Sequence, residues 1–432
     1  MILVLGGTTE GRIAVQTLEE AGKPFYYSTK GYEQDIPLHN GIRLQGGMDK
    51  DAMESFCRKE NISLLIDAAH PFAEELHRNV NDVSDKLQIP AILYDRIYPR
   101  IEKHDGIVWC DSFEDAVQKI KKEEVYILLA LTGVKSIGKL KALWQESCRC
   151  YFRILDRESS RELARSEAFP EEYLRYYHAG EDERLLIRQI RPDAIIIKES
   201  GASGGFSEKV EAAQELGIRI FIIKRPPLQP NLLPVNGRHG LRRMVELYHP
   251  GFYDLRSGFT TGTCAAAAAA AAIWDIFNLD GTPRPPEFIV TLPNGEMIGV
   301  PVEPQKQRPR SSSVNDNWMV ESEACVIKDA GDDPDITNGM QIKVNIALPF
   351  NMDEVNSGKQ QDDYNIIIAG GEGIGIVTMP GLGLELAAPA INPTPRKMIE
   401  ENVRMYLSYV GVPKMSNPIV VTISVPGGEE IA

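Results

Sequence analysis

The chain has 432 residues, of which 43% are hydrophobic and 25% are charged, and its formal net charge is −14. This length exceeds what one ordinary hydrophobic core organises, so we expect two or three domains. The negative charge argues against a nucleic-acid partner. No apolar run approaches the roughly 20 residues of a membrane span, which argues against a membrane partner as well.

The first residues and the cysteines indicate a cytoplasmic protein with reduced thiols. Met1 leads directly into the apolar run ILVLG, without the basic segment that opens a secretory signal. The six cysteines lack the spacing of a zinc site or a disulfide framework, and Cys148 and Cys150 are too close for a usual metal pair. We therefore expect no metal.

Short apolar runs and helical segments alternate through residues 1–100. One helix is expected to end near Gly22, and another to begin after a cap at Asp49 and to continue through Glu60. The strands are expected at Ile2–Leu5, Pro24–Ser28, Ile42–Gln45, Ser63–Asp67 and Pro90–Tyr94. This alternation predicts a parallel sheet with helices on both faces.

A glycine-rich turn, Gly6-Gly7-Thr8-Thr9, follows the first strand and precedes the first helix. Strand, glycine turn and helix together can hold a phosphate on backbone N–H groups. The spacing differs from G-x-G-x-x-G, however. On this turn alone, nucleotide binding and a plain structural turn remain equal alternatives.

An acid and a histidine follow the fourth strand. Asp67 ends the strand and His70 lies three residues later, at the kind of edge where ligands bind in open parallel sheets. The two side chains are candidates for orienting a cofactor or supplying a proton. The alternative for both is structural support of the loop.

The pattern begins again in residues 110–248. A helix is expected at Phe113–Lys122, followed by strands at Val125–Leu131, Tyr151–Leu155, Asp193–Lys198 and Ile218–Ile223, the last being the final strand. Ser136 and Ser207 are expected to cap helices. Glycine-rich segments again follow two strands, at Thr132-Gly133 and at Gly201–Gly205. Two Rossmann-like parallel-sheet subdomains, at about 1–100 and 110–248, would leave a cleft between these edges.

This half resembles the precorrin-6A reductase family (CbiJ/CobK). The motifs that carry the likeness are LGGTTEGR at 5–12, DAAHPFA at 67–73, LTGVKS at 131–136, KESGASGG at 198–205 and Lys224-Arg225-Pro226. The resemblance covers 1–248 and implies reduction of one double bond of a corrin precursor, (cobalt-)precorrin-6A to -6B, with a nicotinamide cofactor. Ala69 departs from the threonine that the family often has.

The resemblance also assigns roles to residues at the strand ends. Gly6 to Thr9 would hold pyrophosphate, and Arg12, Lys198 and Lys209 are candidate partners for anions of the substrate or cofactor. The candidate cofactor-binding residues are Gly6, Gly7, Thr8, Thr9, Glu10, Arg12, Ser28, Thr29, Lys30, Thr132, Gly133, Lys198, Ser200, Gly201, Gly204 and Gly205.

The end of the second strand distinguishes NADH from NADPH, because an acidic residue there binds the ribose 2′-hydroxyl. This chain has Ser28, Thr29 and Lys30 at that point, and two hydroxyls with an ammonium suit a 2′-phosphate. Lys30 also fits a solvated loop, and reductases of the cobalt-containing branch are associated with NADH. We expect NADPH, with NADH as the alternative.

The stretch LRSGFTTGTCAAAAAAAA at 255–272 separates the two halves of the chain, after a short linker at 249–254. It predicts a loop feeding a helix whose N-terminus is capped by threonine hydroxyls and can bind an anion. The eight alanines would let another backbone, or a large flat ligand, come very close. Cys264 near the helix start has either a lowered pKa or, as we favour, the role of a small buried residue.

Residues 255–432 then change to a β-rich pattern. Glu287–Leu292 and Met297–Val302 flank an Asn-Gly turn and predict a hairpin, and residues 304–317 predict a polar loop. The acidic run 329–335 lacks calcium-loop spacing and predicts a solvated turn. A strand at Asn365–Ala369 leads to a second glycine loop, Gly370–Gly375, and Thr394-Pro395 begins a helix to about Val410.

RSGFTTGTCAAAAA, GGEGIGIVT and PAINPTPRKMI resemble the cobalt-precorrin-5B (C1)-methyltransferase family (CbiD). The resemblance implies an α+β domain that methylates a tetrapyrrole with S-adenosylmethionine. We expect this domain to be incomplete at its C-terminus, so that methyl transfer would need the completed domain and the 432-residue form would lack it. Corrin-pathway enzymes are candidate protein partners. The candidate pocket residues are Thr260, Thr261, Gly262, Thr263, Cys264, Gly370, Gly371, Glu372, Gly373 and Gly375.

Two other classes of function stay open on the residues alone. The first half could be a dehydrogenase or epimerase of a sugar nucleotide, although the Tyr-x-x-x-Lys pair of such enzymes is absent. The second half could be a tetrapyrrole-binding module without catalysis. We further expect the two halves to be independent, so that residues 1–248 would fold alone.

Overall fold

The computed structural model describes residues 1–31, 36–98, 105–178, 180–278, 282–314, 317–351, 363–379, 385–412, 414 and 417–430. These residues form two compact units. Unit 1 contains Met1–Gln16 and Pro24–Pro234, and unit 2 contains Thr17–Lys23 and Val235–Ala432. None of the described helices is both long and apolar enough to span a membrane.

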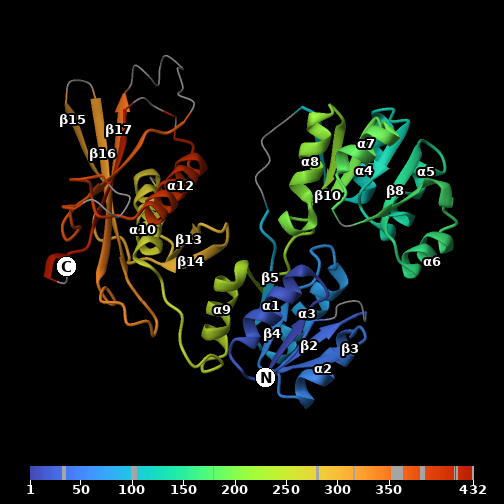
Figure 1. Cartoon of the computed structure of the whole chain (residues 1–432), viewed down its shortest axis with the longest axis horizontal. Coiled ribbons are helices and arrows are strands. Elements are labelled where there is room, and N and C mark those ends of the chain that lie inside the picture. The colour runs from blue at the N-terminus through green and yellow to red at the C-terminus, as the bar shows by residue number, and fades with distance from the viewer. Residues whose placement is uncertain are drawn as a thin grey trace. The chain divides into compact units, whose positions relative to one another are not determined.

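The first sheet of unit 1 has the strand order β12-β5-β4-β1-β2-β3 (Figure 1). Its strands are β1 (Ile2–Leu5), β2 (Phe25–Thr29), β3 (Gly41–Gln45), β4 (Leu64–Asp67), β5 (Ala91–Tyr94) and β12 (Leu232–Val235). Its helices are α1 (Thr9–Glu19), α2 (Lys50–Lys59) and α3 (Glu74–Leu87). Every residue of β1, β4 and β5 is buried, as expected for parallel strands covered on both faces.

The second sheet has the order β6-β11-β10-β7-β8-β9, and all its pairings are parallel. Its strands are β6 (Ile107–Cys110), β7 (Ile127–Ala130), β8 (Arg149–Leu155), β9 (Leu174–Tyr177), β10 (Ala194–Lys198) and β11 (Arg219–Ile223). Its helices are α4 (Phe113–Lys122), α5 (Lys141–Trp144), α6 (Glu158–Ser166), α7 (Glu183–Ile190) and α8 (Phe206–Glu215). The α/β fold class with two parallel sheets is confirmed.

The two sheets exchange their edge strands. β6 follows β5 in the chain but pairs with β11, whereas β12 follows β11 but lies beside β5. The sequence did not predict β6, β9 or β12, and Ile218–Ile223 is therefore not the final strand of this half. The first sheet draws on residues 232–235 as well as on the N-terminal hundred.

In unit 1, helix capping agrees with the sequence at Asp49 and differs at Ser136 and Ser207. The Asp49 side chain accepts the Ala52 N–H at 2.9 Å, as predicted. Ser136 lies inside a 3-10 turn (Val134–Ser136), where its hydroxyl bonds Thr132 instead of starting a helix. The helix α8 begins before Ser207, after Gly205, which has a φ of 63°. The predictions of Ser136 and Ser207 as caps were wrong because a glycine, Gly133 or Gly205, occupies the position directly before each helical segment.

Unit 2 contains a mixed sheet, a hairpin and three described helices. The sheet order is β15-β16-β17-β19-β18, antiparallel except for the parallel β18–β19 pair, and the hairpin pairs β13 with β14. The strands are β13 (Glu287–Thr291), β14 (Met297–Pro301), β15 (Arg310–Val314), β16 (Asn317–Ile327), β17 (Gln341–Asn351), β18 (Ile366–Gly370) and β19 (Ile419–Ser424). The helices are α9 (Gly237–Tyr248), α10 (Thr261–Phe277) and α12 (Pro393–Tyr409).

The predicted Asn-Gly turn joins β13 and β14, with Gly295 at a φ of 83°. The predicted polar loop at 304–317 is wrong in part, because β15 occupies Arg310–Val314 and pairs with β16. Residues 315–316 of that segment lie outside the described residues. β15 is an edge strand that pairs with β16 alone. An edge strand can be polar, so the composition of this segment did not indicate a strand.

Helix α10 lies at the centre of the unit 2 core. All eight alanines have an exposed fraction of 1% or less. The helix contacts α12 on one side and β16, β17 and the β13–β14 hairpin on others. A helix surrounded in this way has no face for large side chains, so a run of alanine is the composition that fits. Of the two partners predicted for the alanine helix, the structure therefore shows protein segments packed closely against it.

Candidate functional site

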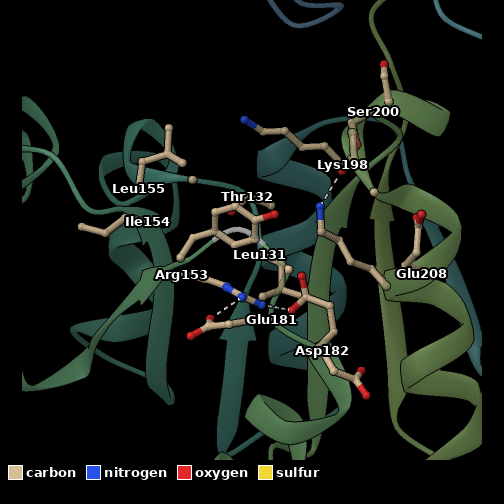
Figure 2. A pocket seen from close by; sticks show the side chains of 18 of the residues that line it. Leu131, Thr132, Arg153, Ile154, Leu155, Glu181, Asp182, Lys198, Ser200 and Glu208 are labelled. Atoms are coloured by element: carbon tan, nitrogen blue, oxygen red, sulfur yellow. Dashed lines mark hydrogen bonds and ion pairs between the residues drawn. The ribbon is translucent and has the colours of Figure 1, made fainter. Parts of the chain in front are cut away.

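A pocket of about 770 Å³ opens in unit 1 at the carboxyl ends of β7, β8 and β10 (Figure 2). Its wall includes Thr132 and Gly133 after β7, Arg153 on β8, and Lys198 at the end of β10. Parallel strands bring their carboxyl ends to one edge, which is where ligands of open α/β sheets bind. We call this cavity the sheet-edge pocket.

Arg153 lines the sheet-edge pocket, and two carboxylates compensate its positive charge. Its side chain is 5% exposed and forms ion pairs with Glu183 and with Glu181, the latter at 2.8 Å (Figure 2). The guanidinium also lies 4.7 Å from the centre of the Tyr177 ring. Arg153 therefore shapes the wall, and its charge is largely compensated.

Lys198 and Lys209 contribute cations that no carboxylate in the described part of the chain pairs with. The Lys198 ammonium lies 5.2 Å from the Phe72 ring centre and 5.5 Å from that of Phe113. Burial, with Lys139 and Lys135 nearby, lowers the pKa of Lys198 to about 8. Lys209 donates to the Gly204 carbonyl at 2.7 Å, and burial lowers its pKa. These ammonium groups can bind anionic groups of a ligand.

His70 lines the same pocket in its neutral form. Burial, together with the positive charges of Arg96 and Lys198, lowers the pKa of His70 to about 3. Its Nδ1 accepts the Phe72 N–H at 3.2 Å, so the ring hydrogen is on Nε2. His70 can therefore donate one hydrogen bond to a ligand, but it does not carry a transferable proton at neutral pH.

Asp67 does not reach the pocket, in contrast to what its position after β4 suggested. It is fully buried and accepts hydrogen bonds from the Ala69 N–H at 3.1 Å and from His77 Nδ1 at 2.6 Å. His77 Nε2 contacts the His70 carbonyl at 3.1 Å. Burial opposes the charge on His77, but Asp67 raises its pKa overall. Asp67 and His77 thus hold the loop that carries His70.

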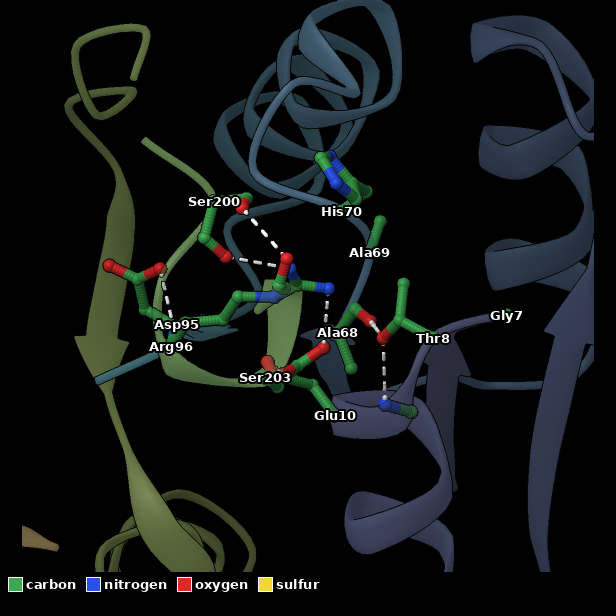
Figure 3. A network of polar contacts seen from close by, with 12 residues as sticks. Gly7, Thr8, Glu10, Ala68, Ala69, His70, Asp95, Arg96, Ser200 and Ser203 are labelled. Atoms are coloured by element: carbon green, nitrogen blue, oxygen red, sulfur yellow. Dashed lines mark hydrogen bonds and ion pairs between the residues drawn. The ribbon is translucent and has the colours of Figure 1, made fainter. Parts of the chain in front are cut away.

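A buried ion pair joins the loops of the two sheets (Figure 3). Arg96, two residues after the end of β5, donates to Glu10 Oε2 at 3.0 Å and to the Ser200 carbonyl at 2.7 Å. Ser203 donates to the other Glu10 oxygen. Burial favours the neutral acid, but Ser203 and Arg96 lower the pKa of Glu10 overall. Glu10 is therefore a contact between loops and is not available to bind a cofactor.

The predicted phosphate turn has one open face. Gly7 is exposed with a φ of 112°, and a Cβ there would meet no described atom within 4 Å. Thr9 and Arg12 are also exposed. The Thr8 hydroxyl is committed, because it donates to the Ala68 carbonyl at 2.8 Å and accepts the Gly11 N–H. Backbone N–H groups of the first turn of α1 can hold a phosphate here.

The sequence-predicted residues of unit 1 fall into two groups. His70, Thr132, Gly133, Lys198, Ser200, Gly204 and Gly205 line the sheet-edge pocket. The others cluster at the first sheet: Gly6, Gly7, Thr8, Thr9, Arg12, Ser28, Thr29 and Lys30. Ser28 and Thr29 are buried, whereas Lys30 is exposed at the end of β2. Gly201 lies against Arg96, outside the pocket lining.

The sequence reasoning missed Arg96 and Arg153. Arg96 follows a buried strand in the same way as Asp67 does, so the argument from strand ends could have found it. Arg153 lies within β8, where a charge would be expected to face solvent, and nothing in the local sequence marks it. Among the described residues, no three His, Cys, Asp or Glu side chains are grouped to hold a metal.

Unit 2 has a pocket of about 680 Å³ at the start of α10, which we call the α10 pocket. The predicted residues Thr260, Thr261, Gly262 and Thr263 line it, together with His239 and Arg243 from α9. Thr260 caps the helix by accepting the Thr263 N–H at 3.1 Å. The anion-binding helix start that the sequence predicted therefore faces a cavity.

Cys264 and the second glycine loop do not line the α10 pocket. Cys264 is fully buried, and burial raises its pKa to about 12, so it is a small core residue. Gly371 and Gly373 lie against Ser424 and Val425, and a Cβ on Gly373 would come within 1.8 Å of the Val425 carbonyl oxygen. The loop Gly370–Gly375, with Glu372, thus packs on the end of β19.

A buried lysine that was not predicted from the sequence supports the α10 pocket. The Lys328 side chain is 0% exposed and donates to Thr261 at 3.2 Å, to Thr337 at 2.6 Å and to Asp335. This contact lowers the pKa of Asp335 to about 2. Residues 332–334 of the acidic run are exposed, as predicted for a solvated turn, whereas Asp335 at its end pairs with the buried Lys328.

Two family models match the two parts of the chain. Residues 1–246 match the family model described as precorrin-6x reductase CbiJ/CobK, and residues 249–432 match the model described as CbiD. A solved structure, CobK precorrin-6A reductase, covers 57% of this chain and 97% of that chain, with 21% identity and a TM-score of 0.47.

Curated relatives of the chain carry the name cobalt-precorrin-5B C(1)-methyltransferase. A cobalt-precorrin-5B C(1)-methyltransferase of Prosthecochloris aestuarii is 41% identical over 179 residues, 41% of this chain and 42% of that protein. One of Moorella thermoacetica is 44% identical over 149 residues, 34% of this chain and 33% of that protein. The aligned part thus spans less than half the length of these relatives.

Proposed function

Because the chain belongs to the precorrin-6x reductase CbiJ/CobK family over residues 1–246, we propose that unit 1 reduces (cobalt-)precorrin-6A to (cobalt-)precorrin-6B. The substrate is a tetrapyrrole that carries several carboxylates. One observation carries the proposal on the structural side: the sheet-edge pocket presents Lys198 and Lys209, to which no described carboxylate is paired. The family match also sets aside the sugar-nucleotide alternative.

The first sheet would hold the nicotinamide cofactor. The open turn at Gly7 and the first N–H groups of α1 fit a pyrophosphate, because a phosphate can approach there without meeting a side chain. Arg12 is exposed one turn further along the helix and can add a positive charge. The cofactor supplies a hydride when bound, and the protein supplies orientation and electrostatics.

Lys198 is the residue of the pocket best suited to release a proton. Its pKa of about 8 keeps Nζ charged at neutral pH and makes the proton more acidic than that of an ordinary lysine. His70, with a pKa of about 3, would donate a hydrogen bond from Nε2 and orient the ligand. Hydride addition to a conjugated ring carbon leaves negative charge that a proton from Lys198 neutralises.

The reduction is tested by incubating the purified chain with precorrin-6A and NADPH, and measuring a mass gain of two hydrogens. Lys198→Met should lower kcat by about 100-fold, in the range that general acids supply. Lys135→Met, at an exposed lysine nearby, is the matched control and should retain activity. Full activity of Lys198→Met would remove Lys198 from the mechanism. If the unmodified chain does not reduce precorrin-6A, the proposed function is refuted.

We propose NADPH as the cofactor, because Lys30 is exposed at the end of β2 and can reach a 2′-phosphate. A charge-assisted contact contributes about 1.5–3 kcal/mol. Lys30→Glu should therefore shift the ratio of kcat/KM toward NADH by at least tenfold. An unmodified protein that prefers NADH, or an unchanged ratio in the variant, would show that Lys30 does not bind the 2′-phosphate.

For unit 2 we propose S-adenosylmethionine-dependent C1 methylation of cobalt-precorrin-5B, the activity in the names of its relatives. The α10 pocket fits such a cofactor, because it combines apolar walls with a helix N-terminus and an arginine. S-adenosylmethionine supplies a methyl group when bound, and the chain has to bind and orient both reactants. Mass spectrometry for a gain of one methyl group tests the proposal. A stable complex with tetrapyrrole but no turnover would favour a binding module.

A further inference from the structure

The family boundary and the structural boundary differ in this chain. The reductase family model extends to residue 246, so helix α9 belongs to it through Glu246. In the structure, α9 belongs to unit 2, which begins at Val235. Two residues of this helix, His239 and Arg243, line the α10 pocket one helical turn apart. The reductase-matched sequence therefore contributes a wall to the pocket of the CbiD-matched unit.

Arg243 is held in place beside the α10 pocket by neutral groups. It donates from Nη1 to the Ser257 carbonyl at 3.0 Å, and its guanidinium lies 4.0 Å from the Phe259 ring centre. No carboxylate in the described part of the chain pairs with it. Because a guanidinium has five N–H donors, the Ser257 contact leaves donors for a ligand.

The two acids nearest to Arg243 are engaged elsewhere. Glu246 accepts the Ser257 N–H at 2.9 Å, the Ser257 hydroxyl at 2.7 Å and Arg242 Nε at 3.0 Å. Asp329 accepts Arg256 at 2.6 Å and the Gly331 N–H at 2.9 Å. Both carboxylates therefore bond other donors, and neither forms an ion pair with Arg243 among the described residues.

The remaining wall of the α10 pocket is largely apolar. Phe259, Leu292, Ile298 and Met398 line it, and the N-terminus of α10 opens into it at Thr261 and Gly262. Asp335 also lines the pocket, and its carboxylate is paired with the Lys328 ammonium. A cation and a helix N-terminus beside an apolar cavity of about 680 Å³ suit a ligand with an apolar body and a carboxylate.

We infer that Arg243 of α9 anchors a ligand carboxylate in the α10 pocket, so that the reductase-matched sequence completes the binding site of the CbiD-matched unit. The inference rests on the proposed function of unit 2 for the choice of ligand. Two sources of the carboxylate fit that function, namely the amino-acid end of an S-adenosyl cofactor and an acidic side chain of a tetrapyrrole. Either would bring a delocalised ring for the apolar wall.

The test is isothermal titration calorimetry on the full chain with two probes, S-adenosylhomocysteine and uroporphyrin, a tetrapyrrole octacarboxylate. Arg243→Gln should weaken the probe that binds in the α10 pocket by about 10- to 100-fold, and Arg243→Lys by less. Arg238→Gln is the matched control on the same helix, since Arg238 pairs with Glu20 and does not line the pocket. It should bind as the unmodified protein does.

A second measurement needs no variant. 5′-Methylthioadenosine keeps the adenosine body of S-adenosylhomocysteine but lacks its carboxylate, and uroporphyrin methyl ester lacks the charges of uroporphyrin. For the probe that binds in the α10 pocket, the analogue should bind the unmodified chain at least tenfold more weakly than its parent, and Arg243→Gln should not weaken the analogue further. The probe that shows this pattern identifies the source of the carboxylate.

The possible results separate the inference from the function on which it rests. If at least one probe binds the unmodified chain and neither loses affinity in Arg243→Gln, Arg243 is not the anchor, and the proposed function of unit 2 stands. Binding of both uncharged analogues as tightly as their parents has the same consequence. If neither probe binds the unmodified chain, both the inference and the proposed function of unit 2 are refuted.

Discussion

The glycine-rich loops of the two units look alike in sequence but are used differently. In unit 1, a Cβ at Gly7 or Gly133 would meet no described atom within 4 Å. In unit 2, a Cβ on Gly258 would lie 1.9 Å from the carbonyl carbon of Ala330, and one on Gly373 would lie 1.8 Å from the Val425 oxygen. The first pair leaves room for a ligand, whereas the second lets two backbones touch.

This difference shows that a glycine-rich loop is not by itself a ligand-binding loop. Close backbone packing requires glycine as strictly as a phosphate does, because both exclude a Cβ. What distinguishes the two cases is the occupant of the space in front of the loop, which depends on the packing of distant segments. Substitutions at the two kinds of glycine should therefore differ in size and in kind.

The largest effect is expected for Gly258→Ala. The new Cβ would overlap the backbone at Ala330, and neither segment can move without displacing the start of α10, so unit 2 should lose about 4 kcal/mol or more. Hydrogen exchange measured by mass spectrometry should show loss of protection in α10 and none in β1 or β4. Unchanged protection of α10 would mean that the packed-glycine explanation is wrong.

The loop Gly201–Gly205 is an intermediate case, because Gly201 and Gly204 pack on side chains, including that of Arg96.

Arg96→Met would leave the buried Glu10 carboxylate without its cation, so unit 1 should lose about 3–5 kcal/mol. Urea unfolding measures this loss, and adding Glu10→Leu should recover most of it. Arg184→Met, which breaks an exposed pair with Glu215, should cost about 0–1 kcal/mol. Similar losses in both variants would contradict the role of burial.

The two units should also respond to opposite ends of the pH scale. Asp335 has a lowered pKa of about 2, so its contribution to unit 2 is complete above about pH 4 and is lost as pH falls toward 2. His77 has a raised pKa, so its contribution to unit 1 is complete below about pH 6 and is lost as pH rises through that pKa. Thermal midpoints between pH 2 and 9 measure both effects. Asp335→Asn should flatten the acid limb alone and His77→Gln the alkaline limb alone.

Of the two glycine substitutions, Gly7→Ala is expected to have the smaller effect on stability. The positive φ of 112° is strained for alanine, but no described atom blocks the methyl group, so the cost should be about 1–2 kcal/mol. NADPH binding should weaken far more than stability, because the methyl group would enter the space proposed for pyrophosphate. Fluorescence titration with NADPH tests this expectation. Normal NADPH affinity would mean that the turn does not hold the cofactor.

Local sequence determined much of this protein. Apolar runs between glycine turns predicted β1, β4, β5, β7 and β10 because a buried parallel strand requires a continuous apolar segment. The Asp49 cap, the Asn-Gly hairpin and the alanine helix followed from the chemistry of a few adjacent residues. The residues expected at strand ends, such as His70 and Lys198, reached one pocket because parallel strands end at one edge.

Only the tertiary structure decided how distant segments combine. The exchange of β6 and β12 leaves no local mark, because either strand satisfies the pattern of either sheet. The same is true of the burial of Lys328 against Asp335, the pairing of Asp67 with His77, and the side of α9 that meets the α10 pocket. A side chain's charge and reach are properties of its residue type. The partner of a side chain depends on which remote segment of the chain lies within its reach, and the neighbouring sequence does not determine that.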